Sequence, residues 1–151
     1  MCRFVEVLEK IKSSSVESVA NKEFSDFNKY MHIPTEMDNE LEMAVRRAAE
    51  YPKALILVCG NSGDGKSHLI GKMMADGIIK ETEFDVYIDA TSSDRKGLFA
   101  NDKLKEKLVP FQDDFIDNGE SYRLIVAINL GVLNDFLKKS EGKYQIFVTY
   151  I

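Results

Sequence analysis

Three segments of the chain have the hydrophobic pattern of buried β-strands. Residues 54–59 and 124–128 are uninterrupted apolar runs, and residues 84–90 are rich in aromatic and β-branched side chains. An uninterrupted run favours a strand buried on both faces, because a strand with one solvated face alternates apolar and polar positions. The pattern therefore predicts a parallel sheet, whose two faces are both covered.

The segments that flank these strands have apolar residues at helical spacing. Apolar positions recur at three- and four-residue intervals in residues 36–48, 66–76, 98–115 and 132–139, and also in residues 4–12 near the N-terminus. Strand, helix, strand, helix, strand in chain order predicts an α/β fold.

Several residues mark where these elements begin and end. Thr35 followed by Asp38 predicts a capping box at the start of a helix, and Gly77 is a plausible helix stop. Pro110 is expected to bend the helix that contains it. The final segment, residues 144–151, is aromatic and β-branched and could form a fourth strand.

The composition is that of a globular protein. The chain has 151 residues, of which 44% are hydrophobic and 30% are charged, so it is apolar enough to bury a core. It contains no run of about 18 apolar residues, and we therefore expect no membrane span. The two cysteines, Cys2 and Cys59, suit reduced thiols in a cytoplasmic protein, because Cys59 lies in a predicted buried strand.

The charge bears on possible partners. The net charge of −5 argues against a generally basic nucleic-acid-binding protein, although it allows a local basic patch or a DNA-binding partner.

One segment carries a chemical motif. Directly after the first predicted strand the chain reads Gly60-Asn61-Ser62-Gly63-Asp64-Gly65-Lys66-Ser67, which fits the phosphate-binding loop G-x-x-x-x-G-K-[ST]. Glycines let the backbone approach phosphates, and successive N–H groups cradle the anion at the start of a helix. We expect Lys66 to reach the β- and γ-phosphates of ATP and the Ser67 hydroxyl to bind Mg²⁺. A chance match is the alternative, but the position between a strand and a helix argues against it.

The motif and the alternation of elements together predict a P-loop NTPase fold, a three-layer α/β architecture around a parallel sheet. We expect residues 1–52 to form a helical N-terminal extension and residues 53–151 to form the NTPase core. A complete sheet of this kind normally has about five strands joined by crossover helices. Three strands and a possible fourth predict a partial core, which we expect to self-associate or to need a partner.

The carboxylate expected beside Mg²⁺ is less clearly marked. Asp89 ends the second strand, which is the place for such an acid, but it could simply cap the following loop. The third strand ends in Asn129, which can orient a water molecule or sense a phosphate but cannot act as a base. Residues 129–131 could equally be only a strand-to-helix turn.

His68, in the first helical turn, either helps to close the nucleotide site or is solvated.

Four segments, in order, resemble one protein family. They are residues 31–35 (Met-His-Ile-Pro-Thr), residues 57–69 with the loop and His68, residues 88–91 (Ile-Asp-Ala-Thr) and residues 125–131 (Ile-Val-Ala-Ile-Asn-Leu-Gly). Together they are similar to the ATP-binding part of the DptF family of bacterial DNA phosphorothioation-dependent restriction proteins.

This resemblance implies a role within an assembly. It implies an ATPase that acts with companion restriction proteins, which include helicase-like and accessory subunits. The target of the complex would be DNA without sulfur in its backbone, and this chain would contact DNA through the complex. It places residues 60–68 in ATP and Mg²⁺ binding and gives Asn129 a sensor-like position. Members of the family are longer than this chain, which puts autonomous ATPase activity in doubt.

Two other functions stay open on the residues alone. A small P-loop nucleotide or metabolite kinase would need an arginine-rich lid, and none is evident because residues 94–107 hold one Arg and four Lys among acids. A remnant that binds nucleotide without activity is the other alternative.

Overall fold

The structure of the chain is a computed structural model. It describes residues 29–30, 32–61, 63–88, 97–113, 120–139 and 144, with the side chains of 97–102 left out. The predicted helix at residues 4–12 therefore lies outside the described residues, as does all of the predicted fourth strand except Tyr144.

The described elements alternate as the hydrophobic pattern predicts, which confirms the α/β class. In chain order they are α3 (Glu36–Ala48), β1 (Lys53–Cys59), α4 (Lys66–Ala75), β2 (Asp85–Tyr87), α5 (Gly97–Leu108), a 3-10 turn (Val109–Phe111), β3 (Tyr122–Ile128) and α6 (Leu130–Lys139).

The three strands form one parallel sheet in the order β1-β3-β2. β3 is central, and its register pairs Lys53 with Tyr122 and Cys59 with Ile128 along the whole length of β1. On its other side β3 pairs with the three residues of β2, from Asp85 opposite Leu124 to Tyr87 opposite Val126. Within the described residues β1 and β2 are thus the two edges of the sheet.

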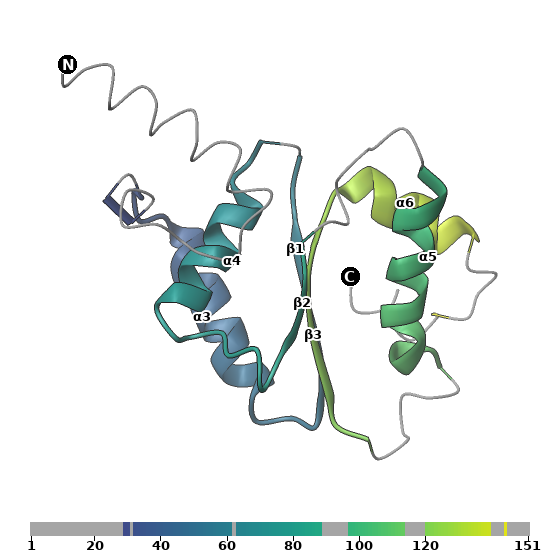
Figure 1. The fold of residues 1–151 in the computed structure, drawn as a ribbon, viewed down its shortest axis with the longest axis horizontal. Helices are drawn as coiled ribbons and strands as arrows, with labels where there is room; N and C mark the ends of the chain where they lie inside the picture. The colour runs from purple at the N-terminus through teal and green to yellow at the C-terminus, as the bar shows by residue number, and fades with distance from the viewer. Residues whose placement is uncertain are drawn as a thin grey trace, which may run out of the picture.

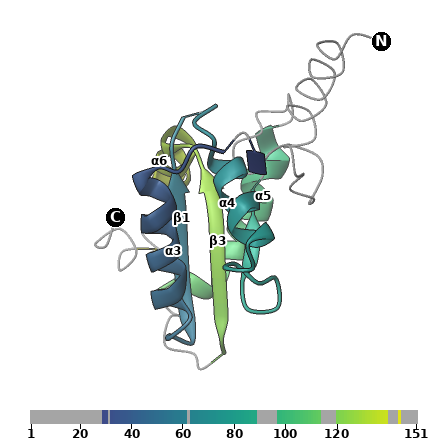
Figure 2. The same cartoon turned by 90° about the vertical axis from the view of Figure 1, so that its left-hand side faces the viewer.

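Helices cover both faces of the sheet. Figure 1 shows α3 and α4 on one side of the strands and α5 and α6 on the other. Seen from the side of α3 and α4, both helices run along the strands, with α3 beside β1 (Figure 2). The result is three layers, with the sheet in the middle.

The central strand is buried on both faces because its side chains alternate between two hydrophobic clusters. Ile125 and Ala127 pack with residues of α3 and α4. Leu124, Val126 and Ile128 pack with residues of α5 and α6. All five are at most 1% exposed, which is the physical reason for an uninterrupted apolar run.

Two of the predicted helix ends agree with the structure, whereas the prediction of one bent helix over residues 98–115 is wrong. Thr35 is the N-cap of α3, and the capping box with Asp38 is present. The chain turns after α4 at Gly77, where φ is +72°, a conformation that glycine adopts without strain. α5 ends at Leu108, and Pro110 lies in the 3-10 turn that follows, because proline has no N–H with which to continue an α-helix.

Two sets of contacts join segments far apart in the chain. Arg123 at the start of β3 donates hydrogen bonds to the carbonyl oxygens of Tyr51 (2.7 Å) and Ala49 (3.0 Å). Tyr144 is buried against Phe136 and accepts a hydrogen bond from Gln112 at 3.2 Å. Among the described helices, none is long and apolar enough to cross a membrane.

Candidate functional site

The phosphate-loop sequence lies at the carboxyl end of the sheet, between β1 and α4. Gly60 follows β1 directly, and its N–H donates to the carbonyl oxygen of Ile128 at 3.3 Å. Gly63 and Gly65 have φ of +91° and +79°, values that side-chain-bearing residues rarely adopt. Glycine is therefore favoured at both positions by the turn itself, although only Gly65 is a fixed glycine of the motif.

The loop already binds an anionic oxygen of its own. The N–H of Asn61 donates to Oδ2 of Asp64 at 2.5 Å. A Cβ on Gly60 would lie 2.9 Å from that same oxygen, so a larger residue there would displace the Asp64 carboxylate. Phosphate oxygens have the same charge and accepting chemistry as this carboxylate. The Asn61 N–H is thus a donor that a negatively charged oxygen already occupies.

Lys66 begins α4 and is turned inward. It is only 6% exposed, and its Nζ donates to the carbonyl oxygen of Asn61. The first N–H groups of α4 and its positive dipole end face the same region. Ser67 follows in the first turn and is half-buried. A buried ammonium at a helix start suits a ligand with several negative charges.

Cys59, the last residue of β1, is a free cysteine. Burial raises the pKa of its thiol, and the nearby Lys66 charge opposes this only in part. Cys59 is thus a neutral thiol next to the loop.

Asn129 follows β3 at the same end of the sheet as the loop. Because Cys59 pairs with Ile128, Gly60 and Asn129 both follow the last paired position. Oδ1 of Asn129 accepts the N–H of Gly131 at 2.7 Å. This is the contact that a strand-to-helix turn requires, and it leaves Nδ2 as the part of the side chain that could face a ligand.

Two other predicted site residues, Ser62 and Asp89, lie outside the described residues. The strand that leads to Asp89, β2, is separated from β1 by β3. Asp89 as a Mg²⁺ ligand therefore stays a prediction.

A histidine pair that the sequence did not indicate lies beside the loop. Nδ1 of His32 is 3.2 Å from Nε2 of His68, and the two rings are stacked with centroids 5.3 Å apart and planes at 21°. His68 belongs to the first turn of α4, and His32 precedes α3. Burial lowers the pKa of His68, with the His32 and Lys72 charges acting in the same direction against Asp38.

Asp38 anchors this pair from α3. Its Oδ1 lies 2.7 Å from Nε2 of His32, and both side chains are only 9% exposed. Its Oδ2 accepts the N–H and the hydroxyl of Thr35 at 2.8 and 2.9 Å. Burial by itself would raise the pKa of Asp38, but the Thr35 hydrogen bonds and the His32 contact outweigh it and hold the pKa below its ordinary value.

The histidines and the loop line one cavity of about 470 Å³. Residues from the segment before α3 form one part of its wall, and residues from the loop and α4 form the other. The lining comprises His32, Ile33, Thr35, Met37, Asp38, Cys59, Asp64, Gly65, Lys66, His68 and Leu69.

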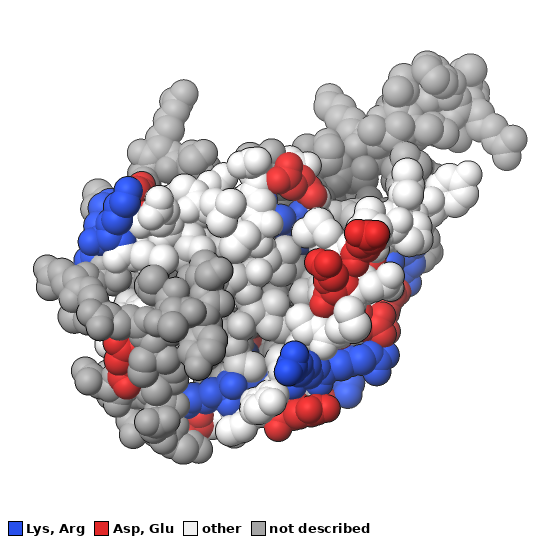
Figure 3. Space-filling model, turned by 180° about the vertical axis from the view of Figure 1, so that it is seen from behind, with Lys and Arg blue, Asp and Glu red and all other residues white. Residues whose placement is uncertain are grey.

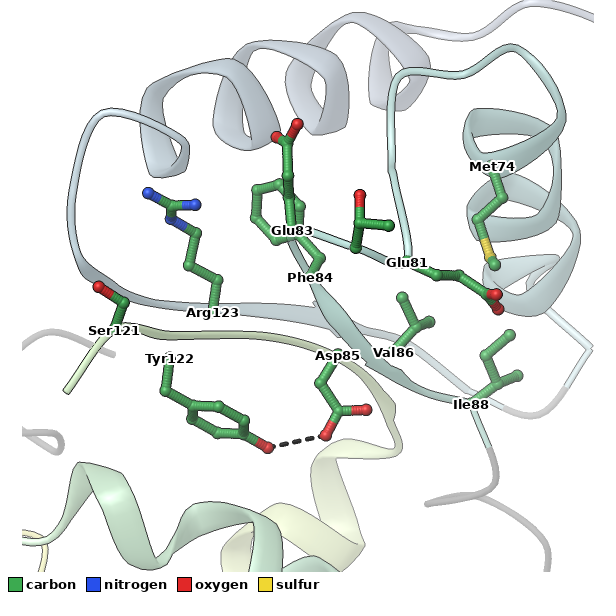
Figure 4. A pocket seen from close by; sticks show the side chains of 11 residues that line it. Met74, Glu81, Glu83, Phe84, Asp85, Val86, Ile88, Ser121, Tyr122 and Arg123 are labelled. Carbon is green, nitrogen blue, oxygen red and sulfur yellow. Dashed lines mark hydrogen bonds between the residues drawn. The ribbon is translucent and has the colours of Figure 1, made fainter.

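A second cavity of about 550 Å³ lies at the opposite, amino end of β2 and β3. Figure 4 shows Tyr122 and Asp85 directed toward each other there, with a hydrogen bond of 2.8 Å. Lys107 also pairs with Asp85. Burial and the Asp85 contact raise the pKa of Tyr122. The hydroxyl and the carboxylate thus satisfy each other, and they join β2, β3 and α5.

The protein side chains alone do not form a metal-binding cluster within the described residues. Within the part of the chain that the structure describes, no group of three or more His, Cys, Asp or Glu side chains could hold a metal ion. A Mg²⁺ ion that needs few protein ligands and is otherwise held by phosphate oxygens fits this arrangement.

Comparison with protein-family models, curated proteins and solved structures finds no match in any of the three. The fold and the site define an α/β protein with a glycine-rich loop between a parallel strand and a helix, at the carboxyl end of the strand.

Proposed function

We propose that the chain binds ATP through residues 60–67 and serves as the ATP-binding subunit of a bacterial DNA phosphorothioation-dependent restriction system. The observation that carries the ATP part is the loop backbone, which holds the Asp64 carboxylate at the Asn61 N–H. The segments at residues 31–35, 57–69, 88–91 and 125–131, which resemble that restriction family, support the system.

In this proposal each loop residue has a defined role. The glycines shape the cradle, the backbone N–H groups bind phosphate oxygens, and Lys66 contributes its positive charge to the β- and γ-phosphates. Ser67 and Asp89 would hold Mg²⁺, which supplies further positive charge to the phosphates when bound. Asn129 acts as a sensor-like residue through Nδ2.

DNA contact through companion proteins is consistent with the charges of the chain. On the face drawn in Figure 3, Lys and Arg side chains lie among Asp and Glu side chains and form no continuous basic surface. A protein that binds DNA directly and broadly usually presents such a surface.

The test of ATP binding is Lys66→Ala, with Lys80→Ala as the matched control. Lys66 is buried at the loop, whereas Lys80 is 60% exposed and pairs with Glu83 at the surface. Removing a charge-assisted contact costs about 1.5–3 kcal/mol, which corresponds to roughly a 10- to 150-fold loss of affinity. Calorimetry with Mg·ATP should show this loss for Lys66→Ala alone. Unchanged affinity in that variant contradicts the assignment of the loop.

The role in restriction needs a separate test in cells. In cells that contain companion restriction genes, transformation by plasmid DNA without phosphorothioate should be suppressed by the wild-type chain and restored by Lys66→Ala. Transfer of the γ-phosphate to a nucleoside or metabolite acceptor in a purified assay would instead favour the kinase alternative.

A further inference from the structure

The cavity beside the loop has two chemically different parts. One part is formed by the phosphate-loop sequence, with Asp64, Gly65 and Lys66. The other part is formed by the segment before α3 and by the first turn of α3, with His32, Ile33 and Met37. A phosphate chain on the loop would therefore have the His32 segment next to it. A nucleotide has the same division, with charged phosphates at one end and a flat, largely apolar base at the other.

We propose that this cavity receives the nucleoside part of the bound nucleotide, and that the His32–His68 pair with Ile33 and Met37 forms its wall. The proposal rests on the proposed ATP binding and adds the place and the residues that recognise the base and ribose. The volume of the cavity, about 470 Å³, is within the range of cavities that hold small organic ligands, about 300–1,000 Å³.

The apolar side chains at the rim point to a ligand with an apolar surface. Ile33 is 80% exposed and Met37 is 48% exposed, although both line the cavity. Pro34 follows Ile33 and favours an extended backbone there, which limits the conformations that the rim can adopt. A base placed against these side chains would remove their apolar area from water, which is favourable.

The histidine pair forms part of the cavity wall beside the loop. Nε2 of His32 lies 2.7 Å from the Asp38 carboxylate. Nδ1 of His32 lies 3.2 Å from Nε2 of His68, and the tautomers of the two rings decide which nitrogen donates. Both rings line the cavity, and aromatic rings are surfaces on which nucleic-acid bases stack.

The experiment compares ATP with inorganic tripolyphosphate, which has the phosphates but no nucleoside. The variant is the double substitution Ile33→Ala with Met37→Ala, whose side chains are exposed and contribute little to folding. Met43→Ala is the matched control, because Met43 is on the same helix, is 64% exposed and does not line the cavity. Thermal unfolding checks that all variants fold.

We expect the wild-type chain to bind ATP at least tenfold more tightly than tripolyphosphate. The double variant should lose roughly 3- to 30-fold in ATP affinity, as expected for partial loss of apolar burial, with no change for tripolyphosphate. Met43→Ala should change neither. As a second measurement, photolabelling of the wild-type chain with 8-azido-ATP should modify residues 32–37 or His68.

The other outcomes separate the two proposals. Equal wild-type affinity for ATP and tripolyphosphate, or photolabelling elsewhere in the chain, overturns the nucleoside site while leaving the phosphate loop intact. An equal loss for both ligands in the double variant also overturns it, because the effect would then act through the loop. Binding of neither ligand by the wild-type chain overturns the proposed function itself.

Discussion

Asp64 brings a negative charge to a place that is built for an anion. Its carboxylate accepts the Asn61 N–H at 2.5 Å and covers Gly60, so a phosphate oxygen and the Asp64 side chain would compete for the same donor. In addition, the two negative charges would repel each other at short distance. Asp64 is therefore a built-in competitor of the ligand.

We expect Asp64→Asn to raise the affinity for ATP and for tripolyphosphate by a similar factor. Removing a like charge about 4 Å from a phosphate is worth about 1 kcal/mol in a water-like environment, or roughly fivefold. Calorimetry measures both ligands, and Asp135→Asn, which changes an exposed aspartate on α6, is the control. A weaker affinity in Asp64→Asn would mean that the carboxylate organises the loop for binding.

The sequence predicted the loop residues but missed their neighbours. Glycine and lysine spacing is local, so residues 60–67 could be found by inspection. His32 lies 36 positions before His68, and their contact depends on the packing of α3 against α4. The one available signal was that His32 and His68 both belong to the segments that carry the family resemblance. The Asp64 contact was missed because the motif allows any residue there.

Among the elements, α3 and α4 are joined by a polar contact next to the site. Asp38 caps α3 through Thr35 and contacts His32, which in turn contacts His68 of α4. Lys72 of α4 also lies 3.6 Å from Asp38. His68, whose pKa burial lowers, therefore lies at the polar contact between α4 and the start of α3.

We expect the free energy of unfolding to decrease as the pH falls below about 6.5, the ordinary pKa of histidine. The pKa of His68 is lowered in the folded chain, so the unfolded chain binds a proton first, and stability is lost as the pH falls from the unfolded toward the folded pKa. Urea unfolding between pH 7.5 and 5 measures this. The decrease should be smaller in His68→Asn.

The outcome that contradicts this expectation is an equal pH dependence in the wild-type chain and His68→Asn. Thr35 and Asp38 are unchanged in that variant, so the cap of α3 is retained. The loss expected from Asp38 protonation lies near and below its ordinary pKa of 3.8 and does not overlap with the histidine range.

The existence of the elements followed from the sequence, but the order of the strands did not. Pro52, Gly60, Gly77 and Pro110 mark element ends locally, and the three apolar segments were therefore placed correctly. None of the three segments indicates which of them lies beside β1. Residues 54–59 and 124–128 are apolar throughout, and residues 84–90 are interrupted only by Asp85 and Asp89. The central place of β3 depends on tertiary packing, and β2 is shorter than the apolar pattern at residues 84–90 predicts.

At the scale of the whole molecule, the two edges of the described sheet differ from its centre. Residues 53–57 of β1 are only partly buried, whereas residues 124–128 of β3 are buried. β1 pairs on one side only within the described residues. An apolar strand with unpaired backbone groups tends to recruit another chain.

We therefore expect the purified chain to self-associate, or to hydrolyse ATP very slowly, unless a companion protein is supplied. Light scattering measures the association, and phosphate release measures the hydrolysis. A stable monomer that turns over ATP on the order of once per second or faster would contradict this expectation.

The pairing of β1 with β3 has a consequence for the newly made chain. Cys59 pairs with Ile128, so the partner strand is synthesised about 70 residues after β1. At roughly 5–20 residues per second, β1 waits several seconds on the ribosome before any of β3 emerges. During that time its apolar residues can pack only against elements that are made before β3, namely α3, α4, β2 and α5. Translation speed, and chaperones that shield an unpaired strand, should therefore govern the yield of folded protein.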